Sequence, residues 1–136
     1  MIVVDASVIL AWLLDENAPE APASIFDTLA DEIVAVPCHW PLEIGNALRS
    51  QLKTGRLTAQ DFLKVMDDLD MLHVRVDPPL HPDEIGPLVK FSVDHSLTAY
   101  DAAYVQLALR QHATLVTLDK NMRNAAQALN IPVLPA

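Results

Sequence analysis

The N-terminal stretch Ile2-Val-Val-Asp5-Ala-Ser7 decides how the rest of the chain is interpreted. Its β-branched run is typical of a short buried strand, and an acidic residue ends that strand. A helix is expected directly afterwards, from about Ser7 to Leu14. The same arrangement returns near the C-terminus, where a strand predicted over 115–117 leads to Asp119 and then to a helix over 121–129. A buried strand that ends near a carboxylate and leads into a helix is therefore used twice.

Between these two units, short apolar runs alternate with helical segments. Further strands are predicted over 33–36 and 72–76, with a short edge strand over 132–134, and further helices over 23–30, 41–54, 58–69, 82–95 and 98–112. The segment 17–22 breaks the first helix. Pro41 opens one helix, Gly55 ends it, and Thr58 with Asp61 resembles a capping box for the next. The pattern predicts an α/β fold with a central, mostly parallel sheet of four to five short strands, in one domain spanning 1–136.

Composition bounds the class of protein. Hydrophobic residues make up 51% of the 136 residues, enough for one packed core, and no apolar run has the length of a membrane span. The single cysteine, Cys38, excludes an intramolecular disulfide, so a cytoplasmic protein without membrane association is expected. The net charge of −9 opposes nucleic-acid binding unless a cation neutralises some of the acids.

Four acids occupy special places in this layout. Asp5 and Asp119 follow strands, at the sheet edge where open parallel α/β sheets bind ligands. Glu43 and Asp101 lie in first helical turns. Each has an ordinary structural explanation: Asp5 and Asp119 are suited to cap helices, Asp101 to pair with Thr98, and Glu43 to favour a helix N-terminus. Together, in largely apolar sequence, they indicate a shared divalent cation, because buried acids without partners are costly.

The donor types favour a hard cation. Carboxylate oxygens suit Mg²⁺ or Mn²⁺ better than Zn²⁺. The histidines show no metal-ligand spacing and are interpreted as surface or loop residues: His39, His73, His81, His95 and His112. Only three glycines are present, so there is no phosphate-cradling loop, and there is no Gly-x-Ser-x-Gly elbow.

These residues also carry a resemblance. Val-Val-Asp5-Ala-Ser7, Pro-Leu-Glu43-Ile-Gly-Asn46, Tyr100-Asp101-Ala-Ala-Tyr and Thr117-Leu-Asp119 look like the successive motifs of PIN domains, and the chain is most similar to VapC-like toxins of type II toxin–antitoxin pairs. The resemblance implies a three-layer α/β/α fold and a metal-dependent endoribonuclease. It assigns catalysis to Asp5, Glu43, Asp101 and Asp119, metal contact to Asp5, Asp101 and Asp119, and supporting roles to Ser7, Asn46 and Thr117. Met122 stands where many relatives have an aromatic residue, which implies only a packing change.

The resemblance further implies an RNA substrate, a homodimer, and a cognate antitoxin that covers the acidic pocket. Basic residues near two motifs are candidate RNA contacts: Arg49, Lys53, Arg56, Lys120 and Arg123. A housekeeping PIN nuclease and a catalytically silent PIN-like binding module remain alternatives. A receiver or phosphatase domain is disfavoured because Asp5 stands alone. Since four clustered carboxylates repel one another, Asp5→Asn is expected to stabilise the metal-free protein.

Overall fold

The computed structural model of the chain describes residues 1–14 and 23–136; the predicted helix break over 17–22 lies outside this range. Strands and helices alternate as the sequence predicts, with boundaries that differ by one or two residues. Their bounds are β1 (Ile2–Val4), α1 (Ala6–Leu13), α2 (Ala23–Asp31), β2 (Ile33–Val36), α3 (Trp40–Lys53), α4 (Ala59–Met71), β3 (His73–Val76), η1 (Pro82–Glu84), α5 (Ile85–Asp94), α6 (Ala99–Gln111), β4 (Thr114–Val116), α7 (Lys120–Ala128) and β5 (Val133–Leu134).

The described strands form one sheet in the order β3-β2-β1-β4-β5, and every neighbouring pair is parallel. The prediction of a mostly parallel sheet is therefore confirmed. From β1 the chain first builds outward through β2 to β3, and it later returns to add β4 and β5 on the other side of β1. Adjacent strands that lead away in opposite directions form a topological switch point, which here lies between β1 and β4.

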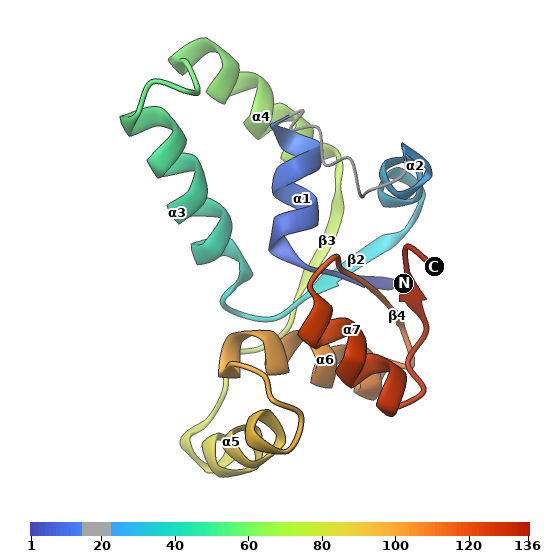
Figure 1. Cartoon of the computed structure of the whole chain (residues 1–136). Helices are drawn as coiled ribbons and strands as arrows, with labels where there is room; N and C mark the ends of the chain where they lie inside the picture. Colours follow the sequence, from blue (N-terminus) through green and yellow to red (C-terminus); the bar gives the residue numbers. More distant parts are fainter. Residues whose placement is uncertain (15–22) are drawn as a thin grey trace.

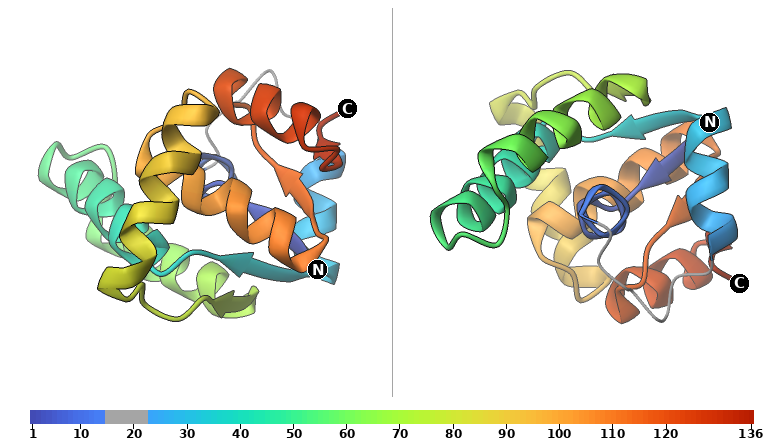
Figure 2. Two further views of the ribbon diagram at one scale, coloured as in Figure 1. Left: turned by 90° about the horizontal axis from the view of Figure 1, so that it is seen from below. Right: turned by 90° about the horizontal axis from the view of Figure 1, so that it is seen from above.

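Helices cover both faces of the sheet, as the three-layer prediction requires (Figure 2). Helix α6 crosses one face against β1, β2 and β4, and α5 packs on its outer side. Helices α1 and α2 lie over the opposite face. Helices α3 and α4 pair as an arm beside α1 (Figure 1).

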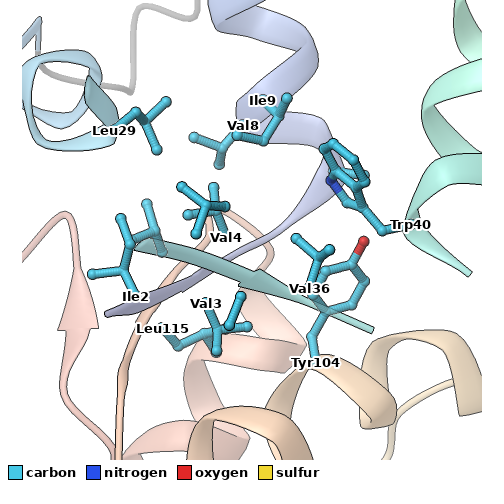
Figure 3. Close-up of a cluster of buried hydrophobic side chains, with 14 of the residues drawn as sticks. Ile2, Val3, Val4, Val8, Ile9, Leu29, Val36, Trp40, Tyr104 and Leu115 are labelled. Atoms are coloured by element: carbon cyan, nitrogen blue, oxygen red, sulfur yellow. The ribbon is translucent and has the colours of Figure 1, made fainter. Parts of the chain in front are cut away.

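Strands β1, β2 and β4 are mostly buried because both faces of the sheet are covered there, whereas the edge strand β3, with the sequence His-Val-Arg-Val, is largely exposed. Val3, Val4, Val36 and Leu115 are all fully buried, and together with residues of α1, α2 and α6 they form the core (Figure 3). The same core holds Tyr104 of α6, whose ring is fully buried below Trp40 at the start of α3. The core thus fixes where α3 and α6 begin relative to the sheet.

Local signals set the ends of these helices. The Thr58 hydroxyl accepts the Asp61 N–H at the start of α4, so the predicted cap is confirmed. Gly55 has a φ of 74°, which favours glycine, directly after α3. No helix in the described segments is long and apolar enough to cross a membrane.

Candidate active site at the topological switch point

Asp5 connects the two central strands of the sheet. Its backbone N–H donates to the Val116 carbonyl, and its carboxylate caps α1 by accepting the Ser7 N–H and hydroxyl at 3.4 and 2.9 Å. The hydroxyl of Thr117, just past β4, donates to the same carboxylate over 3.1 Å. Three donors therefore fix the orientation of the Asp5 side chain.

Thr117 is fully buried and joins Asp5 to Asp119. Its Oγ1 accepts the Asp119 N–H over 3.0 Å while donating to Asp5. The Asp119 carboxylate accepts the Met122 N–H over 2.8 Å and so caps α7. Met122 is completely buried beside Thr117, as expected for a packing residue. Asp5 and Asp119 thus do cap helices, and the caps also hold their carboxylates at the switch point.

Asp101 enters from α6. The Thr98 hydroxyl accepts the Asp101 N–H over 3.1 Å, so this helix begins with the predicted Thr98 cap. Burial raises the pKa of the Asp101 carboxyl, and the charges of Asp119 and then Asp5 raise it further. The hydrogen bond with Thr98 lowers that pKa, and the charge of Glu43 raises it. The direction is upward overall, because neighbouring negative charges oppose ionisation in a partly buried setting.

Glu43 completes the cluster from the first turn of α3. Its Oε1 accepts a 2.6 Å hydrogen bond from the hydroxyl of the buried Tyr104, 61 residues away in the sequence. His39 Nε2 lies 3.3 Å from the same oxygen, and the His39 ring packs against the ring of Tyr104. The structure therefore brings Asp5, Glu43, Asp101 and Asp119 to one sheet edge from four separate elements.

His39 lies in the loop before α3, which agrees with its interpretation as a surface or loop residue. Its side chain is only 18% exposed and contacts the site, which the sequence did not indicate. Tyr104 ends the motif Tyr100-Asp101-Ala-Ala-Tyr, but the sequence gives it no role. The one sequence signal for both is their spacing of four residues, His39 before Glu43 and Tyr100 before Tyr104, which places side chains together only if both segments are helical or nearly so.

The donor atoms of the cluster are of the kind that a hard cation prefers, although the side chains do not form a complete coordination shell. Its donors are carboxylate and hydroxyl oxygens, and the charges of Asp119, Asp5 and Glu43 add to burial in raising the pKa of Asp101. Within the described segments, no three Asp, Glu, His or Cys side chains are gathered closely enough to hold an ion directly. Mg²⁺ fits such a spread-out set, because it keeps several of its water ligands when bound to proteins.

The remaining candidate residues differ in their position. Ser7 contacts Asp5, and Asn46 is exposed one turn beyond Glu43 on α3. Arg49 and Lys53 are exposed further along α3, about 9 and 15 Å from Glu43 at 1.5 Å per residue. Arg56 and Arg123 lie outside the cluster.

Arg56 lines a pocket beyond the end of α3 that also holds Asp61 and Asp68. Arg123 donates to the Thr117 carbonyl at 2.9 Å and to the Pro135 carbonyl at 2.6 Å, so it ties the C-terminal segment to the sheet. Lys120 is exposed and directly follows Asp119, so it is the candidate RNA-binding residue nearest to the acids in the sequence.

Comparisons with known proteins match nearly the whole chain. Residues 2–128 match the family model described as PIN domain. The chain is 33% identical to Ribonuclease VapC9 of Mycobacterium tuberculosis, over 94% of this chain and 93% of that protein. It resembles the crystal structure of PAE2754 from Pyrobaculum aerophilum with a TM-score of 0.68 and 25% identity, covering 97% of this chain and 81% of that one. FitAcB from Neisseria gonorrhoeae, with a TM-score of 0.65, 14% identity and coverage of 98% and 96%, shares the fold.

Proposed function

The chain belongs to the PIN-domain family, and from this premise we propose that it is an endoribonuclease, dependent on Mg²⁺ or Mn²⁺, that acts as the toxin of a toxin–antitoxin pair. The names of its relatives support ribonuclease activity, since a protein 33% identical over 94% of the chain is named a ribonuclease. The observation that carries the proposal is the convergence of four acids at the topological switch point of the sheet. There the charges of Asp119, Asp5 and Glu43 help to raise the pKa of Asp101.

The residues of the cluster take different parts in this proposal. Asp5, Asp101 and Asp119 hold the cation, either directly or through its water ligands. When bound, the cation lowers the pKa of a coordinated water and offsets charge that develops on the phosphate. The Thr117 hydroxyl donates to the Asp5 carboxylate and accepts the Asp119 N–H, and so positions these two residues relative to each other. Glu43, held by Tyr104, orients the attacking water or accepts its proton.

The proposed site also accounts for part of the acidic composition. Four acidic side chains of the cluster belong to a chain with net charge −9, and a divalent cation offsets half of their charge. Lys120 beside Asp119, and Arg49 and Lys53 along α3, are the described candidates for phosphate contact. Arg123 is engaged by two backbone carbonyls, which makes it a weaker candidate.

Cleavage of single-stranded RNA tests the proposal. The purified chain is incubated with a mixed-sequence RNA in Mg²⁺, in Mn²⁺ and in chelator, beside the variant Asp119→Asn, in which the side-chain carbonyl oxygen can still cap α7. We expect internal cleavage that needs the metal and is lost in the variant. Equal cleavage by both proteins would reassign the activity to a contaminant or another site. RNA binding without any cleavage would favour the silent binding module.

Two partners are part of the proposal. The first is a second copy of the chain. Ile85, Val89 and Val93 are exposed at four-residue spacing along α5 and form one apolar stripe, which supports pairing of this helix across a homodimer.

The second partner is a cognate antitoxin that covers the acid cluster and inserts an arginine, since a guanidinium binds carboxylates in a bidentate manner. Co-expression with the product of the neighbouring reading frame tests this partner. Full RNase activity in the resulting complex would refute blockade by the antitoxin.

A further inference from the structure

Tyr100 is an exposed aromatic residue at the edge of the acid cluster. It lies directly before Asp101 in the first turn of α6, and 67% of its surface is accessible to solvent. Most large apolar side chains near the cluster are buried in the core, including Trp40 and Tyr104. A single exposed aromatic ring is ordinary on a protein surface, so a role for Tyr100 has to be argued from its surroundings.

The ring of Tyr100 is supported from below. The His39 ring lies 5.4 Å from it at an interplanar angle of 62°, and the His39 ring also lies 5.5 Å from the Tyr104 ring at 83°. Edge-on contacts of this kind hold aromatic rings in a defined orientation. Tyr104 is fully buried and His39 is mostly buried, so Tyr100 stands on a rigid base although its own ring is open to solvent.

The same aromatic residues are connected to a catalytic candidate. The Tyr104 hydroxyl donates to Glu43 Oε1, and His39 Nε2 lies 3.3 Å from that oxygen. The Tyr100 ring is therefore connected to the Glu43 carboxylate through His39. A planar group stacked on Tyr100 would lie beside the acid cluster.

The charges around the cluster favour such a contact. RNA phosphates are repelled by a chain of net charge −9, and of the five candidate basic residues Lys120 alone lies directly beside the cluster. Arg49 and Lys53 lie further along α3, Arg123 is engaged by carbonyls, and Arg56 lies beyond the end of α3 beside two acids. Affinity must come in part from contacts that do not depend on charge. Stacking of an unpaired base on an aromatic ring supplies this, and it is independent of base identity to a first approximation.

We propose that Tyr100, supported by His39 and Tyr104, is a stacking platform for one unpaired base of single-stranded RNA, which positions the adjoining phosphodiester at the acid cluster. This inference rests on the proposed ribonuclease function and adds a base-binding subsite to it. A duplex keeps its bases stacked internally, so the platform selects unpaired RNA.

Binding and cleavage are measured separately to test the platform. Binding of a fluorescent single-stranded RNA oligonucleotide is followed by anisotropy in Ca²⁺, a hard cation with oxygen ligands that is used here in place of Mg²⁺. Gels verify that the RNA stays intact. In a set of otherwise identical oligonucleotides, one base at a time is replaced by an abasic residue. The proteins are wild type, Tyr100→Leu, Tyr100→Trp and Leu63→Ala, the last being a control on α4 with 66% exposure.

We expect Tyr100→Leu to weaken binding about tenfold, because it keeps an apolar side chain but removes the π-face. Tyr100→Trp should bind at least as tightly as wild type, and Leu63→Ala should bind equally. One abasic position should weaken binding to wild type by about the same factor and cause no further loss in Tyr100→Leu. That lack of additivity identifies the base that contacts Tyr100.

A merely structural role for Tyr100 predicts different results. It would lower the thermal midpoint of Tyr100→Leu and reduce its stabilisation by Mg²⁺, whereas the platform leaves both unchanged. Additive losses from Tyr100→Leu and every abasic position would overturn the platform, even with normal cleavage in Mg²⁺. A non-additive pair in a chain that cleaves no RNA would overturn the ribonuclease function and leave the base-binding subsite in place. Absence of RNA binding would overturn the platform, and absence of both binding and cleavage would overturn the ribonuclease function as well.

Discussion

Replacing Thr117 by Val removes one buried hydroxyl and leaves the shape of the side chain nearly unchanged. This hydroxyl donates to the Asp5 carboxylate over 3.1 Å and accepts the Asp119 N–H over 3.0 Å, at a position with no exposed surface. The bond to the carboxylate contributes about 1.5–3 kcal/mol, and the bond from the backbone contributes about 1 kcal/mol. Because Asp5 is only half-buried and water can replace part of its contact, we expect a total loss of about 2–3 kcal/mol.

Urea unfolding at neutral pH, followed by circular dichroism in chelator, measures this loss. For a domain of this size the loss corresponds to a fall of about 10 °C in the thermal midpoint. Thr117→Ser is the matched control, since it keeps the hydroxyl and removes a methyl group, at about 1 kcal/mol. The expected order of stability is wild type, then Ser, then Val.

The same pair of variants tests whether Thr117 positions the acids. Thr117→Val removes one of the three donors to the Asp5 carboxylate and the acceptor of the Asp119 N–H, so it should reduce the stabilisation gained from millimolar Mg²⁺, whereas Thr117→Ser should retain most of that gain. If the Val variant is as stable as the Ser variant and gains as much from Mg²⁺ as wild type, the hydroxyl neither holds the fold nor organises the site, and the reasoning is refuted.

Three further predictions concern single residues. Asp101→Asn should stabilise the metal-free protein at neutral pH by on the order of 1 kcal/mol. The folded state raises the pKa of Asp101, so the free energy of unfolding of the wild type falls as pH rises from the ordinary pKa of 3.8 through the raised pKa. The stability advantage of Asp101→Asn should therefore vanish below that pH range. Urea titrations across pH measure this advantage, and an advantage that does not change with pH would contradict the prediction. Tyr104→Phe should lower the free energy of unfolding by about 1 kcal/mol, because the half-exposed Glu43 carboxylate can bind water in place of the lost hydroxyl. It should also lower kcat for RNA more than it changes KM. Unchanged kinetics would show that Tyr104 does not position Glu43. Val93→Glu should convert a dimer to monomers in light scattering while the thermal midpoint of the monomer stays within a few degrees, and a persistent dimer would exclude the α5 stripe as its interface.

The structure also changes which acid best tests repulsion within the cluster. The sequence favours Asp5→Asn for this test. In the folded chain, the Asp5 carboxylate accepts hydrogen bonds from Ser7 and Thr117, so its replacement removes favourable contacts as well as a charge. Burial and then the charges of Asp119 and Asp5 raise the pKa of Asp101, so its replacement removes a carboxylate whose ionisation is opposed in the folded chain.

The sequence by itself determined the order and kind of the elements. Strands such as β1 and β2 are short apolar runs rich in β-branched residues, and the helices carry local start and stop signals at Thr58, Thr98 and Gly55. These signals act over a few residues and need no partner from elsewhere in the chain. Since the strands are parallel, acids that follow two strands must lie at one edge of the sheet, so the sequence pattern alone brings Asp5 and Asp119 together.

Only the tertiary structure decided how distant segments meet at that edge. The strand order places β4 directly beside β1, so that the Thr117 hydroxyl reaches Asp5 across 112 residues of sequence. Packing of α6 under the sheet brings Tyr104 to Glu43 and buries most of His39 between aromatic rings. The engagement of Arg123 by two carbonyls arises in the same way. Local periodicity carries no information about these contacts, because they depend on which faces of separate elements are buried against one another in the completed core.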